Sequence, residues 1–280
     1  FDLPGVLKAD EALRSVVLDF KGVRSVDDLT VCAIGAGLPH TVRILDLAFI
    51  HSPHSFKLAG GLITDTGVVS LARKLPQGLR QLSLDFSTND MITDDALFAL
   101  AASMPESLEG LFLRFNGCIQ VTSDGFIALI KRLPSTLTAL ELGFIGCDGI
   151  ADDGFAALGS TFPAGLQDVV LNLSNCSSMT DTGLREMIQG VPDSVKQLSL
   201  FLGMCRGITD AGVLAVSEHL PDSLKELWLM FGCCPGISVD SYAVLARALP
   251  PTVEVLGVAS PIYPFRQPGG WRSPGELREW

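Results

Sequence analysis

The chain has 280 residues, of which 20 are Lys or Arg and 31 are Asp or Glu, giving a net charge of −11. This acidic balance argues against binding to nucleic acid or to an anionic membrane, because either would need a basic stripe. No apolar run reaches the ~20 residues of a membrane span, and no secretory signal is visible, although the sequence begins at Phe1 without a methionine.

A repeat organises nearly the whole chain. Residues 1–12 precede it, and we expect them to cap its first unit. New units then open at Leu13, Val42, Leu79, Leu108, Leu137, Leu166, Val195, Leu224 and Val253. The interval is 29 residues each time, except for 37 between Val42 and Leu79. Such a period predicts one solenoid domain over residues 13–259, with eight full repeats and a partial ninth.

The first part of each unit has the pattern LxxLxLxF, in which apolar and variable residues alternate. This period of two predicts a strand with one buried face. The eighth position extends the buried set and should form a column through the core. Its members are Phe20, Phe49, Phe86, Phe115, Phe144, Leu173, Leu202 and Phe231.

The second part of each unit has helical spacing and contains the motif ITDxG. We expect its threonine to cap the helix N-terminus and its aspartate to face the positive end of the helix dipole. A proline then ends the helix. The expected caps are Thr64, Thr93, Thr122, Thr180 and Thr209, and the prolines are Pro39, Pro76, Pro105, Pro134, Pro163, Pro192, Pro221 and Pro250.

The combination of LxxLxL, a cysteine, ITDxG and LA resembles the cysteine-containing class of leucine-rich repeats, lengthened toward the ribonuclease-inhibitor-like class. The resemblance covers roughly residues 13–259. It implies an α/β solenoid shaped as a curved horseshoe, with a parallel sheet on the concave face and short helices on the convex face. It also implies binding to other proteins without catalysis.

Five of the seven cysteines share one position of the repeat: Cys118, Cys147, Cys176, Cys205 and Cys234. Stacked side by side, they should point in parallel, which suits neither disulfides nor zinc. We expect buried reduced thiols, and Asn89 in the same position supports a role in packing or in capping the bend. Cys233 should be exposed. This pattern favours a reducing compartment, the cytoplasm first, with an organelle such as a plastid as the alternative.

The second unit carries eight extra residues around 51–61, which should form a loop on one face, often a binding face. His51 and His54 lie in this loop. They lack a third ligand or a partnered carboxylate, so we expect a polar surface loop without metal, in which both histidines are candidate contacts for a protein partner. No other pattern predicts a cofactor site or a catalytic site, and we expect no enzyme.

The variable strand positions should face the concave side. Phe112 and Arg114 lie on one strand, while Phe201, Trp228 and Met230 should form an exposed apolar cluster on two later ones. Such a cluster on a sheet face predicts a contact surface for another protein. Acidic residues spread along the same face favour a partner with a basic surface: Asp19, Asp46, Asp85, Glu141, Asp168 and Glu226.

Residues 260–280 leave the repeat and contain prolines, glycines and aromatic residues, including Tyr263, Phe265, Trp271 and Trp280. Such a segment should gain order by lying on a surface, either its own solenoid or a partner. The sequence therefore predicts a non-catalytic scaffold for protein interactions, as an accessory subunit of a larger assembly. The alternative is a regulator that inhibits or activates a partner enzyme bound on the concave face.

Overall fold

The computed structural model describes residues 12–23, 25–50 and 63–259, together with Gly5, Leu7 and Asp10. The loop at 51–62 and the tail at 260–280 lie outside these residues, and so do the predicted contact residues His51, His54, Tyr263, Phe265 and Trp271.

Strands and helices alternate along the described chain. The strands are β1 (Ser15–Asp19), β2 (Ile44–Ala48), β3 (Gln81–Asp85), β4 (Gly110–Arg114), β5 (Ala139–Gly143), β6 (Asp168–Asn172), β7 (Gln197–Phe201), β8 (Glu226–Met230) and β9 (Val255–Ala259). The helices are α2 (Asp28–Gly37), α3 (Asp65–Ala72), α4 (Asp94–Ala102), α5 (Ser123–Ile130), α6 (Asp152–Thr161), α7 (Asp181–Gln189), α8 (Asp210–Glu218) and α9 (Val239–Ala248).

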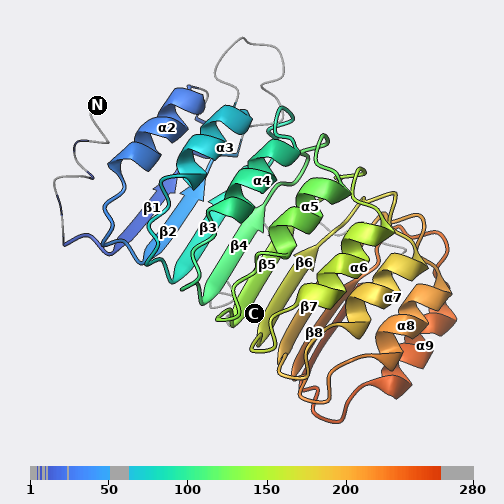
Figure 1. Cartoon of the computed structure of the whole chain (residues 1–280). Coiled ribbons are helices and arrows are strands. Elements are labelled where there is room, and N and C mark those ends of the chain that lie inside the picture. The colour runs from blue at the N-terminus through green and yellow to red at the C-terminus, as the bar shows by residue number, and fades with distance from the viewer. Residues whose placement is uncertain are drawn as a thin grey trace.

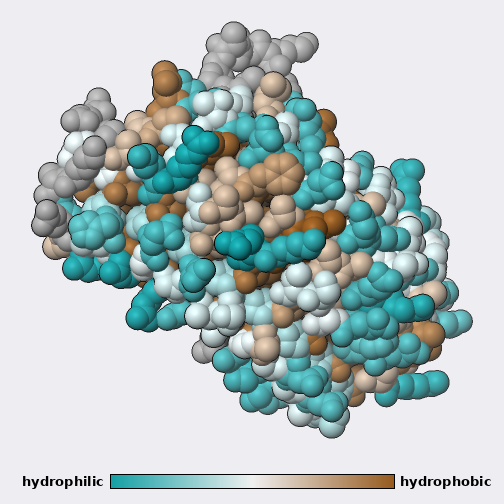
Figure 2. All heavy atoms as spheres, in the orientation of Figure 1, coloured by the Kyte–Doolittle hydropathy of each residue, from teal (hydrophilic) through white to brown (hydrophobic). Residues whose placement is uncertain are grey.

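The strands form one parallel sheet in sequence order, and the helices form a second layer on one side of it (Figure 1). Each strand pairs with the next through equivalent positions of the repeat, as in Leu82 with Leu111. One repeat is therefore one coil of the stack. This confirms the predicted α/β leucine-rich-repeat solenoid. In the view of Figure 2, the helix-bearing side is mostly hydrophilic, with scattered hydrophobic residues.

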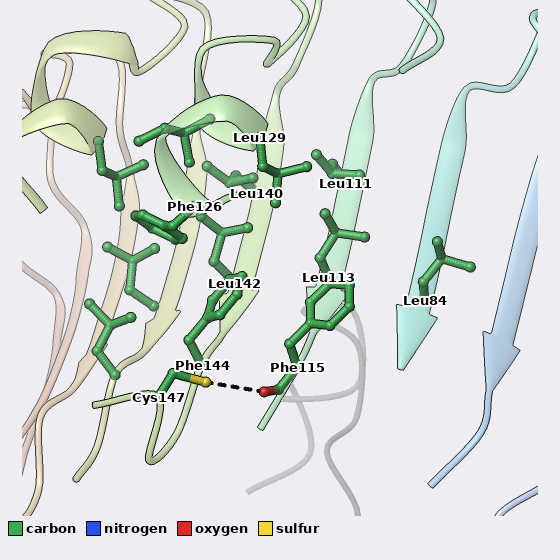
Figure 3. Packing of buried hydrophobic residues seen from close by; sticks show 14 of the residues in the cluster. Leu84, Leu111, Leu113, Phe115, Phe126, Leu129, Leu140, Leu142, Phe144 and Cys147 are labelled. Carbon is green, nitrogen blue, oxygen red and sulfur yellow. Dashed lines mark hydrogen bonds between the residues drawn. The ribbon is translucent and has the colours of Figure 1, made fainter. Parts of the chain in front are cut away.

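The core lies between the two layers and is filled by the inward positions of each strand. The predicted phenylalanine column is present: the ring centroids are 5.6 Å apart from Phe20 to Phe49, 5.1 Å from Phe49 to Phe86 and 5.8 Å from Phe86 to Phe115. Phe144 continues the column and also meets Phe126 of α5 edge to face (Figure 3). These aromatic contacts tie each coil to the next.

The cysteine column lies at the bends after β4 to β8. The Cys147 thiol donates a hydrogen bond of 3.3 Å to the carbonyl of Phe115 in the preceding unit (Figure 3), and Cys118, Cys176, Cys205 and Cys234 make the equivalent bond. All five thiols are buried and free, as predicted, and burial raises the pKa of Cys118 to about 12. Asn89 replaces the thiol with an amide that donates to the carbonyls of Phe49 and Phe86. Cys233 is exposed, also as predicted.

The threonine and aspartate of the ITDxG motif join adjacent coils. Thr209 caps α8 by accepting from the backbone N–H of Ala211, which confirms the predicted cap. Its own N–H and hydroxyl donate to the two carboxylate oxygens of Asp181, one unit earlier, at 2.8 and 2.6 Å. The same pairing links Asp28 to Thr64, Asp65 to Thr93, Asp94 to Thr122 and Asp152 to Thr180. We call this series the Asp–Thr ladder.

One junction of the ladder has both members replaced. Ser123 stands at the aspartate position and Ala151 at the threonine position of the following unit. The Ser123 hydroxyl accepts from the backbone N–H of Ala151 at 3.0 Å and donates to Asp153 at 2.6 Å. The link between the coils is kept with other atoms, so the motif serves this junction rather than the helix cap alone.

The tenth position of the described units has a left-handed backbone at each bend. Glycine occupies it at Gly22, Gly117 and Gly146, where a positive φ involves no strain from a side chain. The last three bends hold Asn175, Met204 and Cys233 in the same conformation, with φ of 58°, 64° and 62°. Thr88, with φ of 68°, Met204 and Cys233 are uncommon residues for a left-handed backbone.

Candidate functional site

The side of the sheet that faces away from the helices carries the variable strand positions. Phe201 and Met230 occupy paired positions of β7 and β8, and Trp228 lies two residues before Met230 on the same strand. The predicted cluster is therefore assembled on one face. Its three side chains are half-buried rather than fully exposed.

Trp228 lies flat on the last strand. A Cβ atom placed on Gly257 of β9 would be 2.0 Å from Cε3 of the Trp228 ring. Every earlier strand has a side chain at the position of Gly257, so β9 offers a platform of bare backbone for the indole. A side chain at position 257 would collide with the ring, so the glycine is what allows the indole to occupy this position.

Met204 lies on the bend next to the end of β8. Its side chain is exposed, and its N–H donates to the carbonyl of Gly232, two residues beyond Met230, at 2.7 Å. We call Met204, Trp228 and Met230 the thioether–indole patch. Sequence reasoning missed Met204 and Gly257. The signals were an outsized residue at a bend where other units have glycine, and a glycine where other strands have a side chain.

The middle of the face holds an ion-pair cluster. The Arg114 guanidinium donates to both carboxylate oxygens of Glu141, at 2.6 and 2.9 Å, and lies 3.9 Å from Asp85. Burial raises the pKa of Glu141, and Arg114 opposes that shift. Burial also raises the pKa of Asp85, against hydrogen bonds from Ser87 and the charge of Arg114. In such an arrangement the charges stabilise one another, so the Arg114 guanidinium is already paired within the molecule and is not free to bind a partner.

The remaining predicted contact positions differ in access. Phe112 is only 9% exposed, and its ring packs against Gly110 of the same strand. Two of the six predicted acidic residues, Asp85 and Glu141, are buried. Asp19 is exposed, Asp46 is half-buried, and half-buried Glu226 accepts from Gln197 at 3.2 Å. Asp168 of β6 is half-buried as well, so accessible negative charge lies on either side of the buried Asp85 and Glu141.

Over residues 12–23, 25–50 and 63–259, no group of three or more His, Cys, Asp or Glu side chains is arranged to hold a metal ion. Within the same residues, no helix is long and apolar enough to cross a membrane.

No protein-family model matches the sequence, and no curated protein sequence is detectably similar to it. Solved structures that resemble the fold include the following two. A chain of the Rad7 and Elc1 complex in yeast is 19% identical over 91% of this chain and 71% of that chain, with a TM-score of 0.52. The leucine-rich repeat-containing protein LegL7 from Legionella pneumophila is 16% identical over 89% of this chain and 84% of that chain, with a TM-score of 0.47.

Proposed function

We propose that the protein is a non-catalytic scaffold that binds another protein through the concave face of its sheet, as an accessory subunit of a larger assembly. The observation that carries this proposal is the thioether–indole patch. Trp228 and Met230 point away from the core on β8, and Met204 is exposed on the neighbouring bend.

The chemistry of the patch suits protein recognition. A half-buried tryptophan supplies a large contact area at little further entropy cost when its orientation is already fixed, as Gly257 fixes that of Trp228. The thioethers of Met204 and Met230 are soft and adapt to the shape of an apolar anchor. A partner would place an apolar side chain here.

The charge around the patch favours a basic group beside that anchor. Glu226 lies on the same strand as Trp228, and the chain as a whole has a net charge of −11. Long-range attraction of this kind speeds encounter and sets orientation more than it adds affinity. The Arg114 cluster shapes the floor of the face but contributes little to contact, because its charges already satisfy one another.

The test is capture of partners from native extract by the full chain, followed by titration of the purified partner. Trp228→Ala should raise the Kd by at least about fivefold, which corresponds to ~1 kcal/mol. The fold should stay intact, since the indole lies outside the core. If the captured partner is an enzyme, its activity with one equivalent of the protein tells a plain scaffold from a regulator.

Val170→Ala provides the matched control. Val170 occupies the same strand position on β6 and is also half-buried, but it lies two strands from Trp228. Its Kd should change by less than about twofold. Equal affinities for the wild-type protein and the Trp228 variant would refute the proposed surface, and loss of folding in that variant would place the indole in the core.

A further inference from the structure

The C-terminal end of the solenoid leaves core positions uncovered by the described residues. In β2 to β8 the two inward side chains of each strand are at most 1% exposed, whereas in β9 Leu256 is 45% exposed and Val258 is 37% exposed. The helix layer shows the same change. The position of Ala246 is buried in α3 to α8 and exposed in α9, and Val244 of α9 is exposed as well. We call Val244, Leu256 and Val258 the end face.

The opposite end of the stack is closed. Val16 of β1 is 4% exposed, and Leu7 from the segment before the first repeat belongs to the same buried core. A short non-repeat segment therefore covers the first coil. Stacked repeats need such a cover at both ends, because each coil buries its apolar side only against a neighbour.

β9 also has an unpaired edge. It is the last strand of the described sheet and pairs only with β8. Alternate backbone N–H and C=O groups of an outer strand point away from its partner and offer a template for another chain. An open edge beside exposed Leu256 and Val258 would favour aggregation unless something covers it.

We propose that residues 260–280 dock on the end face and place Ile262, Tyr263 and Phe265 against Leu256, Val258 and Val244. The chain leaves β9 at Ala259, on the rim of this face. The three apolar residues follow within six positions, a reach of up to ~20 Å for extended chain. That reach exceeds the spacing of about 10 Å between packed layers, so the segment can cross from the strand to the helix layer.

The prolines of the segment suit this position. Pro261 precedes the proposed contact residues, Pro264 lies between Tyr263 and Phe265, and two more prolines follow at Pro268 and Pro274. Proline has no N–H to donate, so a proline-rich strand on the edge of β9 would not accept a further strand outside it. The segment would thus bury the apolar residues of the end face and prevent another strand from pairing with the sheet.

Docking of residues 260–280 is a separate property from the proposed scaffold function, because the end face is distinct from the concave surface that carries the thioether–indole patch. It also supports that patch. Trp228 rests on the backbone of Gly257 in β9, and a cover that holds β9 in place would keep the indole oriented. The tail would then act on partner binding through β9 without touching the partner.

Hydrogen exchange of the full chain, followed by mass spectrometry, tests the proposal. The variant Ile262→Ser, Tyr263→Ser, Phe265→Ser should exchange the amides of Val255–Ala259 at least about tenfold faster than the wild type. The conservative variant Ile262→Val, Tyr263→Phe, Phe265→Leu should retain protection. Trp280→Ser serves as the control within the tail, and β3 and β4 serve as the internal reference for an intact fold.

Two results would overturn the proposal. Exchange in β9 that is equally fast in the wild type and the serine variant would show that these residues do not cover the end face. Protection that rises with protein concentration, together with a doubled mass in light scattering, would assign the end face to a second copy of the chain.

Discussion

Removing one carboxylate from the Asp–Thr ladder should weaken the stack by more than an ordinary surface change. Asp181→Ala abolishes two hydrogen bonds to Thr209, of 2.8 Å from the N–H and 2.6 Å from the hydroxyl. Hydrogen bonds to a charged group contribute about 1.5–3 kcal/mol each, but Asp181 is only half-buried and water can replace part of the loss. We expect a decrease of about 2–3 kcal/mol in the free energy of unfolding.

A double-mutant cycle isolates the link between the coils. Thr209→Val removes the hydroxyl, and with it one ladder bond and the cap of α8. We expect this change to lower the free energy of unfolding by about 2 kcal/mol. The two changes together should cost at least ~1 kcal/mol less than their sum, because they share a bond. Urea unfolding followed by circular dichroism gives all four values.

Asp124→Ala is the matched control for that cycle. Asp124 is an exposed carboxylate in the first turn of α5, so it shares the dipole contribution and stands one position beyond the ladder. Its loss should cost less than about 0.5 kcal/mol. The reasoning fails if Asp181→Ala costs no more than Asp124→Ala, or if the cycle is additive.

Two further predictions concern the ion-pair cluster and the bends. Arg114→Met should cost about 3 kcal/mol at pH 7, because it leaves the buried carboxylates of Asp85 and Glu141 without their cation. Burial already raises the pKa of both groups above the unfolded values, so the folded variant binds protons more tightly, and its deficit should shrink as the pH falls toward 4. A deficit that is independent of pH in urea titrations would contradict this account. Gly117→Ala should cost about 1 kcal/mol, since φ is +76° there, whereas Gly232→Ala, with open space and no positive φ, should be neutral or stabilising; equal effects on thermal unfolding would show that the bend carries no strain.

The repeat made the architecture predictable from the sequence. Once equivalent letters are neighbours in space, the positions of Phe86 beside Phe115 and of Phe201 beside Met230 follow from counting alone. The thiol column and the caps followed in the same way, because each depends on one residue type at one position of the unit.

What the sequence did not predict depends on pairs of positions that differ between units. The bond from Arg114 to Glu141 runs diagonally between the seventh position of one strand and the fifth of the next, so no repeat pattern marks it. The half-buried state of Trp228 depends on a single glycine in the following strand. The solvent exposure of a side chain on a sheet face depends on its neighbours on both adjacent strands. The alternation of apolar and polar residues along one strand does not contain that information.

The Asp–Thr ladder gives the stack a direction. Each threonine that begins a helix is held by a carboxylate belonging to the coil before it. During synthesis, the threonine of a new coil would find the carboxylate of the preceding coil already in place as a hydrogen-bond acceptor. If folding began at the C-terminal end, the threonine would have no acceptor until the preceding coil had folded. We expect the protein to wind from its N-terminal end, with synthesis and folding advancing in the same sense.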